Sequence, residues 1–204
     1  MFHVEQNDDL QISSQLRDKF EIYKTLLFKW QKAVNLVSNN SLEDFWNRHI
    51  SDSLQIVPYI YGNKVLDVGS GGGFPGMVLA MTGKFDVTCV DSDSRKMTFL
   101  SEVARQTNTQ VNLINDRIEK IRESNFDTVC ARGFSSLKKL LKITLQRGQV
   151  GVFLKGLKLS NELEEAQHFF DFQYQIYPSR TDKTGNIIVV SDIGERNKCP
   201  QYSI

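Results

Sequence analysis

Cysteine is scarce in this sequence, and no long apolar run is present. The three cysteines, Cys89, Cys130 and Cys199, are too few and too scattered for a disulfide framework or a zinc site. No apolar stretch approaches the roughly 20 residues that a membrane-spanning helix requires. The first residues, MFHVEQNDDLQ, are polar and acidic rather than apolar as in a secretory signal. We therefore expect a cytoplasmic protein with no metal and no membrane contact, and we expect a monomer.

The sequence also lacks an excess of charge of one sign. It contains 25 Lys and Arg against 24 Asp and Glu, a net charge of +1, whereas strong nucleic-acid binders are often plainly basic. Basic side chains nevertheless gather without any acid between them at Lys138, Lys139, Lys142, Arg147, Lys155 and Lys158. Taken alone, this stretch favours a solvated helix face with loops. An RNA-binding surface is the alternative interpretation.

Two segments with helical periodicity precede a regular alternation of strands and helices. Residues 13–36 and 41–60 carry apolar side chains at spacings of three and four, which predicts amphipathic helices. Strands are then predicted at 64–69, 85–91, 111–115, 126–132, 149–156, 172–178 and 186–192. Helices are predicted at 75–84, 94–108, 117–121, 135–145 and 160–170.

This alternation predicts an α/β fold with a Rossmann-like, mostly parallel seven-stranded sheet. The last two predicted strands have no helix between them, so we expect them to form an antiparallel pair, as in the sheet of S-adenosylmethionine-dependent methyltransferases. We expect residues 61–204 to form the methyltransferase domain. Residues 1–60 would form a helical cap on the same structural unit.

A glycine-rich segment, VLDVGSGGGFPG at residues 65–76, joins the first of these strands to the following helix. Glycines at such a turn can adopt positive φ and let the backbone approach a ligand. Residues 71–76 formally match G-x-G-x-x-G, for which a tight structural turn is the alternative interpretation. Asp67 would repel the pyrophosphate of a dinucleotide but would favour the ammonium and sulfonium groups of S-adenosylmethionine. Asp91, at the end of the second strand, is predicted to accept hydrogen bonds from ribose hydroxyls.

Two catalytic motifs of nucleic-acid methyltransferases are absent from the sequence. After the fourth strand the chain reads CARGF at residues 130–134, not the Asn/Asp-Pro-Pro-Tyr/Phe that amine-directed enzymes use. Cys130 has no preceding proline and lies in an apolar strand, so we interpret it as a buried structural thiol rather than a nucleophile. N7 of guanine would need neither motif, because it has a free lone pair and no proton. Catalysis there reduces to alignment and exclusion of water.

The chain resembles the bacterial 16S rRNA guanine-N7 methyltransferases, the RsmG or GidB family. The motifs that carry the resemblance are WQKAVNL at residues 30–36, FWNRHISDSL at 45–54, GSGGGFPG at 69–76, Asp91 with Arg95, Lys96, Phe99 and Leu100, then Arg117, Arg132 and Leu154–Gly156. Gly133 is a departure, because the family usually has alanine there. The resemblance implies transfer of a methyl group from S-adenosylmethionine to N7 of guanine 527 in 16S rRNA, free or in the small ribosomal subunit.

The resemblance also implies roles for individual residues. Residues lining the cofactor pocket would include Gly69, Phe74, Ile118, Glu119 and Arg132, besides Gly71 and Asp91 from the glycine loop and second strand. Residues facing the RNA would be Asn35, His49, Arg117, Arg132 and Lys155. Structural roles are the alternatives: a helix C-cap for Asn35, a core histidine for His49, an ion pair with Asp116 or Glu119 for Arg117, and a solvated strand end for Lys155.

Arg117 and Arg132 are the predicted catalytic residues. One of them would contact O6 of the guanine or a flanking phosphate through its planar donor fork and leave N7 free to attack. Because its positive charge would oppose the cation forming on the base, we expect a nearby acid, Glu119 or Asp67, to offset it. The remaining alternatives for function are a methyltransferase of another RNA, a protein or a small molecule, a nicotinamide-dependent dehydrogenase, and a non-catalytic RNA-binding module.

Overall fold

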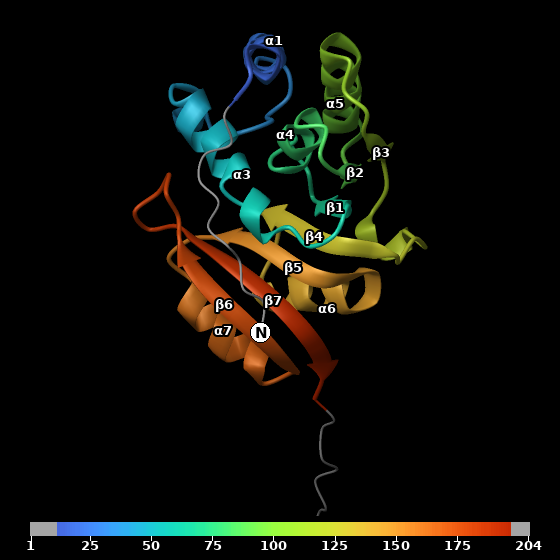
Figure 1. The fold of residues 1–204 in the computed structure, drawn as a ribbon, viewed down its shortest axis with the longest axis vertical. Helices are drawn as coiled ribbons and strands as arrows, with labels where there is room; N and C mark the ends of the chain where they lie inside the picture. The colour runs from blue at the N-terminus through green and yellow to red at the C-terminus, as the bar shows by residue number, and fades with distance from the viewer. Residues whose placement is uncertain (1–11, 197–204) are drawn as a thin grey trace, which may run out of the picture.

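A computed structural model describes residues 12–196 of the chain and shows one seven-stranded sheet with helices on both faces (Figure 1). The strand order is β3-β2-β1-β4-β5-β7-β6. Strand bounds are β1 Lys64–Val68, β2 Asp86–Val90, β3 Asn112–Ile114, β4 Phe126–Arg132, β5 Gly148–Lys155, β6 Phe170–Pro178 and β7 Asn186–Glu195. The pairs among β1 to β5 are parallel, whereas β7 is antiparallel to both β5 and β6. The predicted Rossmann-like sheet and its antiparallel closing pair are confirmed.

The strand sequences explain why both faces of the sheet are covered. In β1, Val65 packs on one face, and Leu66 and Val68 pack on the other, as the two-residue period of a strand requires. The longer helices are α1 Ser14–Gln31, α4 Gly76–Met81, α5 Ser94–Thr107, α6 Leu137–Arg147 and α7 Leu159–Gln167. Figure 1 shows α4 and α5 together above β1–β3, and α6 and α7 together beside β5–β7.

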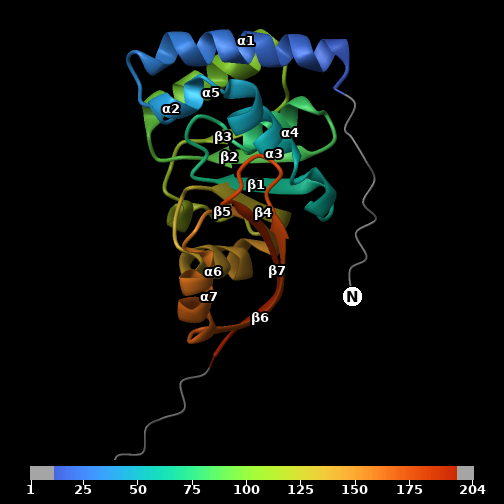
Figure 2. The same cartoon turned by 90° about the vertical axis from the view of Figure 1, so that its left-hand side faces the viewer.

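Helix α1 is the outermost layer of the N-terminal region and lies across α5 (Figure 2). Ser13 begins it as an N-cap, because its side chain accepts a hydrogen bond from the amide of Leu16 at 3.2 Å. Phe20, Tyr23 and Leu27 of α1 are fully buried and share one apolar core with the sheet. The division of the chain at residue 60 stays a prediction. No helix in the described part of the chain has the length and apolar character of a bilayer span.

The segment predicted as one helix over residues 41–60 is not continuous, and this prediction is wrong. It contains α2 Asn39–Leu42, a π-helical turn η1 Trp46–Ser51, α3 Asp52–Leu54 and a 3-10 turn η2 Val57–Tyr59. In η1, the backbone N–H of Asp52 bonds to the carbonyl of Asn47, five residues earlier. The wider turn lets His49 and Ile50 both be buried. Such π turns occur often at functional sites.

Candidate active site

Two cavities meet at the carboxyl ends of the central strands. The larger, of about 590 Å³, is bounded by the glycine loop, the end of β4, the end of β5 and the segments around residues 36–52 and 179–186. The smaller, of about 180 Å³, lies beyond the ends of β1 and β2 and against the turn η3 Ile118–Lys120. Gly69 lines both cavities. A single elongated ligand crossing Gly69 could therefore occupy both.

The glycine loop is held against the end of β2 by Asp91. One carboxylate oxygen of Asp91 accepts the amide N–H of Gly71 at 2.9 Å, and the other accepts that of Asp93 at 2.9 Å. Gly69 and Gly71 have φ of +68° and +56°, a conformation that favours glycine. Asp91 thus shapes the loop and also lines the smaller cavity, where its remaining lone pairs could accept ligand hydroxyls.

Asp67 lines neither cavity, so it could favour a cationic ligand only through its charge and not by direct contact. Its side chain is fully buried and accepts the amide N–H of Gly76, at the start of α4, at 3.2 Å. The thiol of Cys130 lies 3.8 Å from its other oxygen. Burial raises the pKa of Asp67 to about 6. Asp67 therefore anchors α4 to the sheet, and Cys130 is the buried thiol that its strand context predicts.

Arg132, the last residue of β4, is held by three acceptors in the larger cavity. Its Nη1 donates to the carbonyl of Arg48 at 2.6 Å and to Oδ2 of Asp52 at 3.0 Å. Its Nη2 bonds to Nδ1 of His49 at 2.9 Å. An arginine has five N–H donors, so Nε–H and one Nη2 N–H have no acceptor among residues 12–196. Those two donors remain for a ligand.

His49 is a buried histidine with both ring nitrogens occupied. Nδ1 accepts from Arg132, and Nε2 lies 3.1 Å from the hydroxyl of Ser41. Burial, and then the positive charges of Arg132 and Arg48, lower the pKa of His49 to about 3. The ring is therefore neutral near pH 7, and Nδ1 must be the unprotonated nitrogen that accepts from arginine.

Phe74 forms an apolar wall of the larger cavity. Its ring stacks on His49 with centroids 4.5 Å apart and on Tyr23 at 5.1 Å. The guanidinium carbon of Arg132 lies 5.0 Å from the centroid of Phe74, within the range of a cation–π contact. The glycine loop, η1 and β4 are therefore joined at this ring, which lines the larger cavity. That this cavity takes the cofactor stays a prediction.

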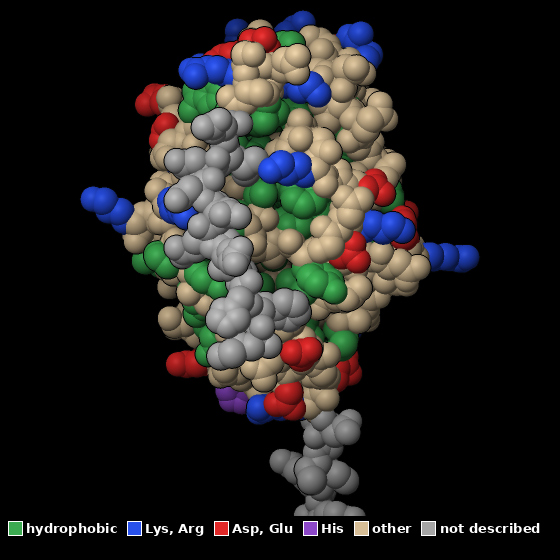
Figure 3. Space-filling view, viewed as in Figure 1, with side chains coloured by type: hydrophobic (Ala, Val, Ile, Leu, Met, Phe, Trp, Pro, Cys, Tyr) green, Lys and Arg blue, Asp and Glu red, His purple; other side chains and the backbone are tan. Residues whose placement is uncertain are grey.

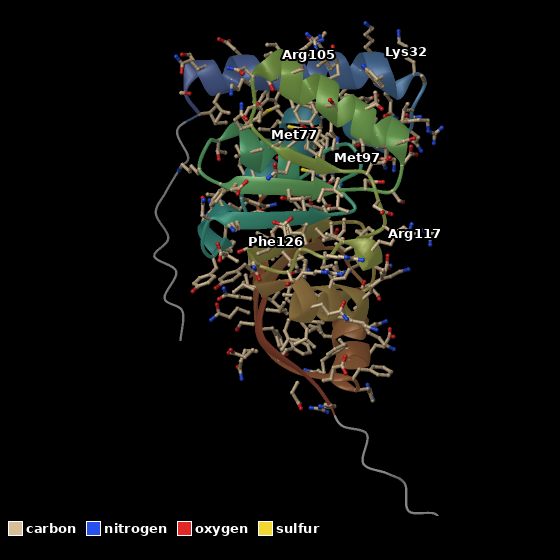
Figure 4. The ribbon with its side chains drawn as sticks, turned by 90° about the vertical axis from the view of Figure 1, so that its right-hand side faces the viewer. Lys32, Met77, Met97, Arg105, Arg117 and Phe126 are labelled. Atoms are coloured by element: carbon tan, nitrogen blue, oxygen red, sulfur yellow. The ribbon has the colours of Figure 1, made fainter. Side chains whose placement is uncertain are left out.

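The smaller cavity contains several of the residues predicted for cofactor and RNA binding. Ile118 is buried and lines it together with Glu119 and Arg117. Glu119 pairs with Lys139 at 3.0 Å. Arg117 is exposed, and Figure 4 shows it projecting from the edge of the molecule. Arg117 and Arg132 therefore line different cavities.

The other residues predicted to face RNA are placed differently from one another. Asn35 is exposed and accepts the side-chain N–H of Gln31 at 3.3 Å, outside the lining of the larger cavity. Lys155 lines that cavity, but its ammonium pairs with Glu162 at 2.6 Å and donates to the carbonyl of Ser135 at 2.9 Å. Lys155 is thus neither a solvated strand end nor a free cation.

Acids from other elements neutralise much of the basic stretch. Lys138 pairs with Glu165 at 3.7 Å, and Lys139 and Lys155 have the partners given above. Figure 3 shows blue and red side chains interspersed on the face that it presents. Lys142 and Lys158 are exposed and have no ion-pair partner among the described residues. Among those residues, no group of three or more His, Cys, Asp or Glu side chains could hold a metal ion.

Sequence reasoning missed the contribution of the loop between β6 and β7. Within it, Thr181 donates its hydroxyl hydrogen bond to Oδ1 of Asp52 at 2.5 Å, and Asp182 pairs with Arg48 at 2.8 Å. Asp52 belongs to the FWNRHISDSL segment at residues 45–54, but no role was predicted for it. The available signal was an acid four residues after Arg48 and three after His49.

Comparison with protein families gives one match that covers most of the chain. The model of the family described as GidB, rRNA small subunit methyltransferase G, matches residues 16–186. A protein named ribosomal RNA small subunit methyltransferase G from Rhodospirillum rubrum is 40% identical over 190 residues, 91% of this chain and 94% of that protein. The protein of the same name from Rickettsia prowazekii is 36% identical over 188 residues, 90% and 98% of the two chains.

Two solved methyltransferase structures have a similar fold at low sequence identity. The magnesium protoporphyrin IX methyltransferase of Synechocystis, solved with bound S-adenosylmethionine, has a TM-score of 0.57 and 11% identity, covering 90% of this chain and 99% of that one. A TehB-like methyltransferase from Corynebacterium glutamicum has a TM-score of 0.56 and 15% identity, covering 84% and 98%. These similarities confirm the methyltransferase fold.

Proposed function

The chain belongs to the rRNA small subunit methyltransferase G family, and from this premise we propose that it transfers the methyl group of S-adenosylmethionine to N7 of guanine 527 in 16S rRNA. The family assignment decides against a dehydrogenase. It leaves the acceptor atom and nucleotide to be supported from the site. The partner would be 16S rRNA or the small ribosomal subunit, which for a bacterial enzyme means a cytoplasmic location.

The observation that carries the proposal is the pair of cavities joined at Gly69. The smaller cavity offers a carboxylate, Asp91, for ribose hydroxyls and an apolar side chain, Ile118, for adenine. The larger cavity has room for the methionine part of the cofactor and for a base beside Arg132. The residues present therefore fit the cofactor. When bound, S-adenosylmethionine supplies a methyl group activated by its sulfonium.

An acceptor without a proton matches the chemistry of the larger cavity. His49 is its only histidine, and both ring nitrogens are engaged. The two acids that line it, Asp52 and Asp182, are each paired with an arginine. None of these groups is poised to remove a proton, and guanine N7 needs none removed. The residues would align the base and exclude water.

Within this proposal, Arg132 is favoured over Arg117 as the residue that contacts the guanine. Arg132 lies in the larger cavity with two free N–H donors, whereas Arg117 lies on the smaller one. Arg132 would donate to O6 or a flanking phosphate and leave N7 open. The cofactor would contact Gly69, Gly71, Phe74, Asp91, Ile118, Glu119 and Arg132. The RNA would contact His49. The nucleotides that flank the target guanine would contact Asn35, Arg117 and Lys155.

The test is methyl transfer from radiolabelled S-adenosylmethionine to small-subunit rRNA, followed by mapping of N7-methylguanosine. We expect one modified guanine, position 527, and its absence when Arg132→Ala protein is used. Naked 16S rRNA and assembled subunits should be assayed in parallel to identify the substrate form. Methylation of a different RNA, or of another atom, would replace this proposal by the first alternative. Cofactor binding without any transfer to RNA would favour a non-catalytic module.

A further inference from the structure

Positive charge accumulates in the larger cavity during the proposed reaction. The guanidinium of Arg132 is permanently charged, and the sulfonium of the cofactor adds a second cation. Transfer of the methyl group moves that second charge onto the guanine without removing it from the cavity. Like charges at close range in a partly dehydrated site repel strongly. The site therefore needs a negative charge close to Arg132, and this argument depends on the proposed function.

Neither acid that the sequence suggested is in contact with Arg132. Glu119 lines the smaller cavity and already pairs with Lys139. Asp67 is buried on the α4 side of the sheet and lines neither cavity. The acid in direct contact with Arg132 comes instead from the start of α3.

Asp52 is held beside Arg132 by hydrogen bonds to both of its carboxylate oxygens. Its Oδ2 accepts from Nη1 of Arg132 at 3.0 Å, and both side chains are mostly buried, with 15% and 21% exposed. Its Oδ1 accepts from Thr181 at 2.5 Å and from the side chain of Gln55 at 2.8 Å. Of the other cations that line this cavity, Arg48 is paired with Asp182 and Lys155 with Glu162. Asp52 lines the larger cavity itself.

We propose that Asp52 is a positioning residue that fixes the guanidinium of Arg132 and offsets its charge, so that the cofactor and then the methylated base can bring a second positive charge into the cavity. Thr181 fixes Asp52 in turn, so the loop between β6 and β7 contributes to the orientation of Arg132. An acid with a purely structural role would hold α3 and the loop together. Its replacement would then change the affinities for charged and uncharged ligands equally.

That difference provides the readout, because S-adenosylmethionine and S-adenosylhomocysteine differ by one methyl group and one positive charge. Asp52→Asn keeps the size and can still accept from Arg132 while it loses the charge. We expect the ratio of the Kd for S-adenosylmethionine to the Kd for S-adenosylhomocysteine to rise about tenfold in this variant. Calorimetry on the full chain measures both constants. The control is Asp171→Asn, an exposed acid paired with Arg196 outside both cavities, which should leave the ratio unchanged.

Two further variants separate charge from position. Thr181→Val keeps the carboxylate but removes one of its supports, so turnover should fall severalfold while the ratio of the two Kd values stays at the wild-type value. If Asp52→Asn does not fold, as judged by its circular dichroism, Asp52→Ser removes the charge with a smaller side chain and should raise the same ratio.

The outcomes distinguish this inference from the proposed function. A wild-type protein that binds neither ligand contradicts the proposed function and this inference with it. A wild-type protein that binds both, with a Kd ratio unchanged when Asp52 is replaced, overturns the inference alone. Equal weakening of both ligands would likewise show that Asp52 is only structural. A raised ratio in Asp52→Asn or Asp52→Ser, with unchanged ratios in Asp171→Asn and Thr181→Val, establishes the charge-balancing role.

Discussion

At the scale of single residues, the proposed role of Arg132 requires the planar shape of its guanidinium as well as its charge. The guanidinium donates hydrogen bonds to three acceptors, two through Nη1 and one through Nη2, and two N–H donors remain for a ligand. A lysine ammonium has three donors on one atom and cannot reach all three acceptors. We predict that Arg132→Lys lowers the rate of rRNA methylation by about a hundredfold, nearly as much as Arg132→Ala.

The matched control for this prediction is Arg105→Lys. Arg105 pairs with Glu102 on the surface of α5, where 70% of its side chain is exposed. Single-turnover rates with saturating cofactor give the comparison. A rate for Arg132→Lys within a few-fold of wild type would mean that a point charge is enough, and the fork argument would fail.

The low pKa of His49 predicts that the free energy of unfolding depends on pH, and this dependence can be assigned to the imidazole of His49. Its pKa is about 3 in the folded protein against 6.5 as its ordinary value, so the unfolded chain binds an additional proton between these pH values. The free energy of unfolding therefore loses up to about 1.4 kcal/mol per pH unit as pH falls from 6.5 towards 3, and the full contribution is present above 6.5.

The measurement is urea unfolding of wild type and His49→Asn at several pH values. The difference in unfolding free energy between them should shrink as pH falls below 6.5, because the variant has no such proton uptake. Asp67, with its raised pKa, contributes with the opposite sign but is present in both proteins. The methylation rate should show no inflection near neutrality that disappears in the variant. A difference in stability that is independent of pH would contradict the buried neutral ring.

At the scale of elements, the glycine loop separates a ligand-binding role from a folding role. Gly71 has φ +56°, and an added Cβ there would meet no atom closer than 3.8 Å. Gly73 has φ +92°, and a Cβ there would collide with Tyr23, Leu100 and Met77. We predict that Gly71→Val lowers affinity for S-adenosylhomocysteine at least tenfold in a folded protein, because valine is strained at positive φ and the bond to Asp91 is lost.

Gly83→Val is the control, since Gly83 has φ +69° and open space in a turn outside both cavities. It should cost similar stability and leave the affinity unchanged. Gly73→Val should instead lower Tm strongly or prevent folding. Equal affinities for Gly71→Val and wild type by calorimetry would show that the loop does not hold the cofactor.

Within the basic stretch, Lys155 and Lys158 should behave differently. Only 9% of the side chain of Lys155 is exposed, and its loss leaves the Glu162 carboxylate partly buried without its cation. We predict that Lys155→Met lowers Tm by several degrees. Lys158→Met should keep Tm and reduce the slope of log affinity for rRNA against log salt by about one unit. An unchanged slope in Lys158→Met would identify that side chain as a solvated one that does not contact phosphate.

Local sequence predicts helices and strands well where one spacing of apolar residues runs through the whole element. The apolar runs of β1, β2, β4 and β5 end at glycine, aspartate or arginine, and each lies within two residues of its predicted bounds. The 41–60 segment fails because its apolar spacing fits a helix on average, whereas the backbone widens to a π turn at Trp46–Ser51. The widened turn places His49 against Arg132, a contact between residues 83 positions apart, which no local pattern contains.

At the scale of the whole molecule, the sequence predicts which residues gather but not what they touch. Strand ends that follow one another in a parallel sheet must meet at one edge, so Gly69, Asp91 and Arg132 were expected there. Asp67 lies on a strand end too, but the two-residue period points its side chain to the α4 face. Asp52 reaches Arg132 from the start of α3, and Thr181 reaches Asp52 from the loop between β6 and β7. The sequence does not specify the strand order that places this loop.

The position of β7 in the sheet has a consequence for the order in which the molecule can be completed during synthesis. β7 fills the gap between β5 and β6, with Ile187 beside Leu154 and also beside Tyr177. A nascent chain that has left the ribosome only as far as β6 can assemble β1 to β5, but the outer edge of β5 stays open and β6 has no partner. The loop that carries Thr181 would then lack the second of the two strands that fix its ends. The support that Thr181 gives to Asp52, and through it to Arg132, is therefore completed only when the last strand has been translated.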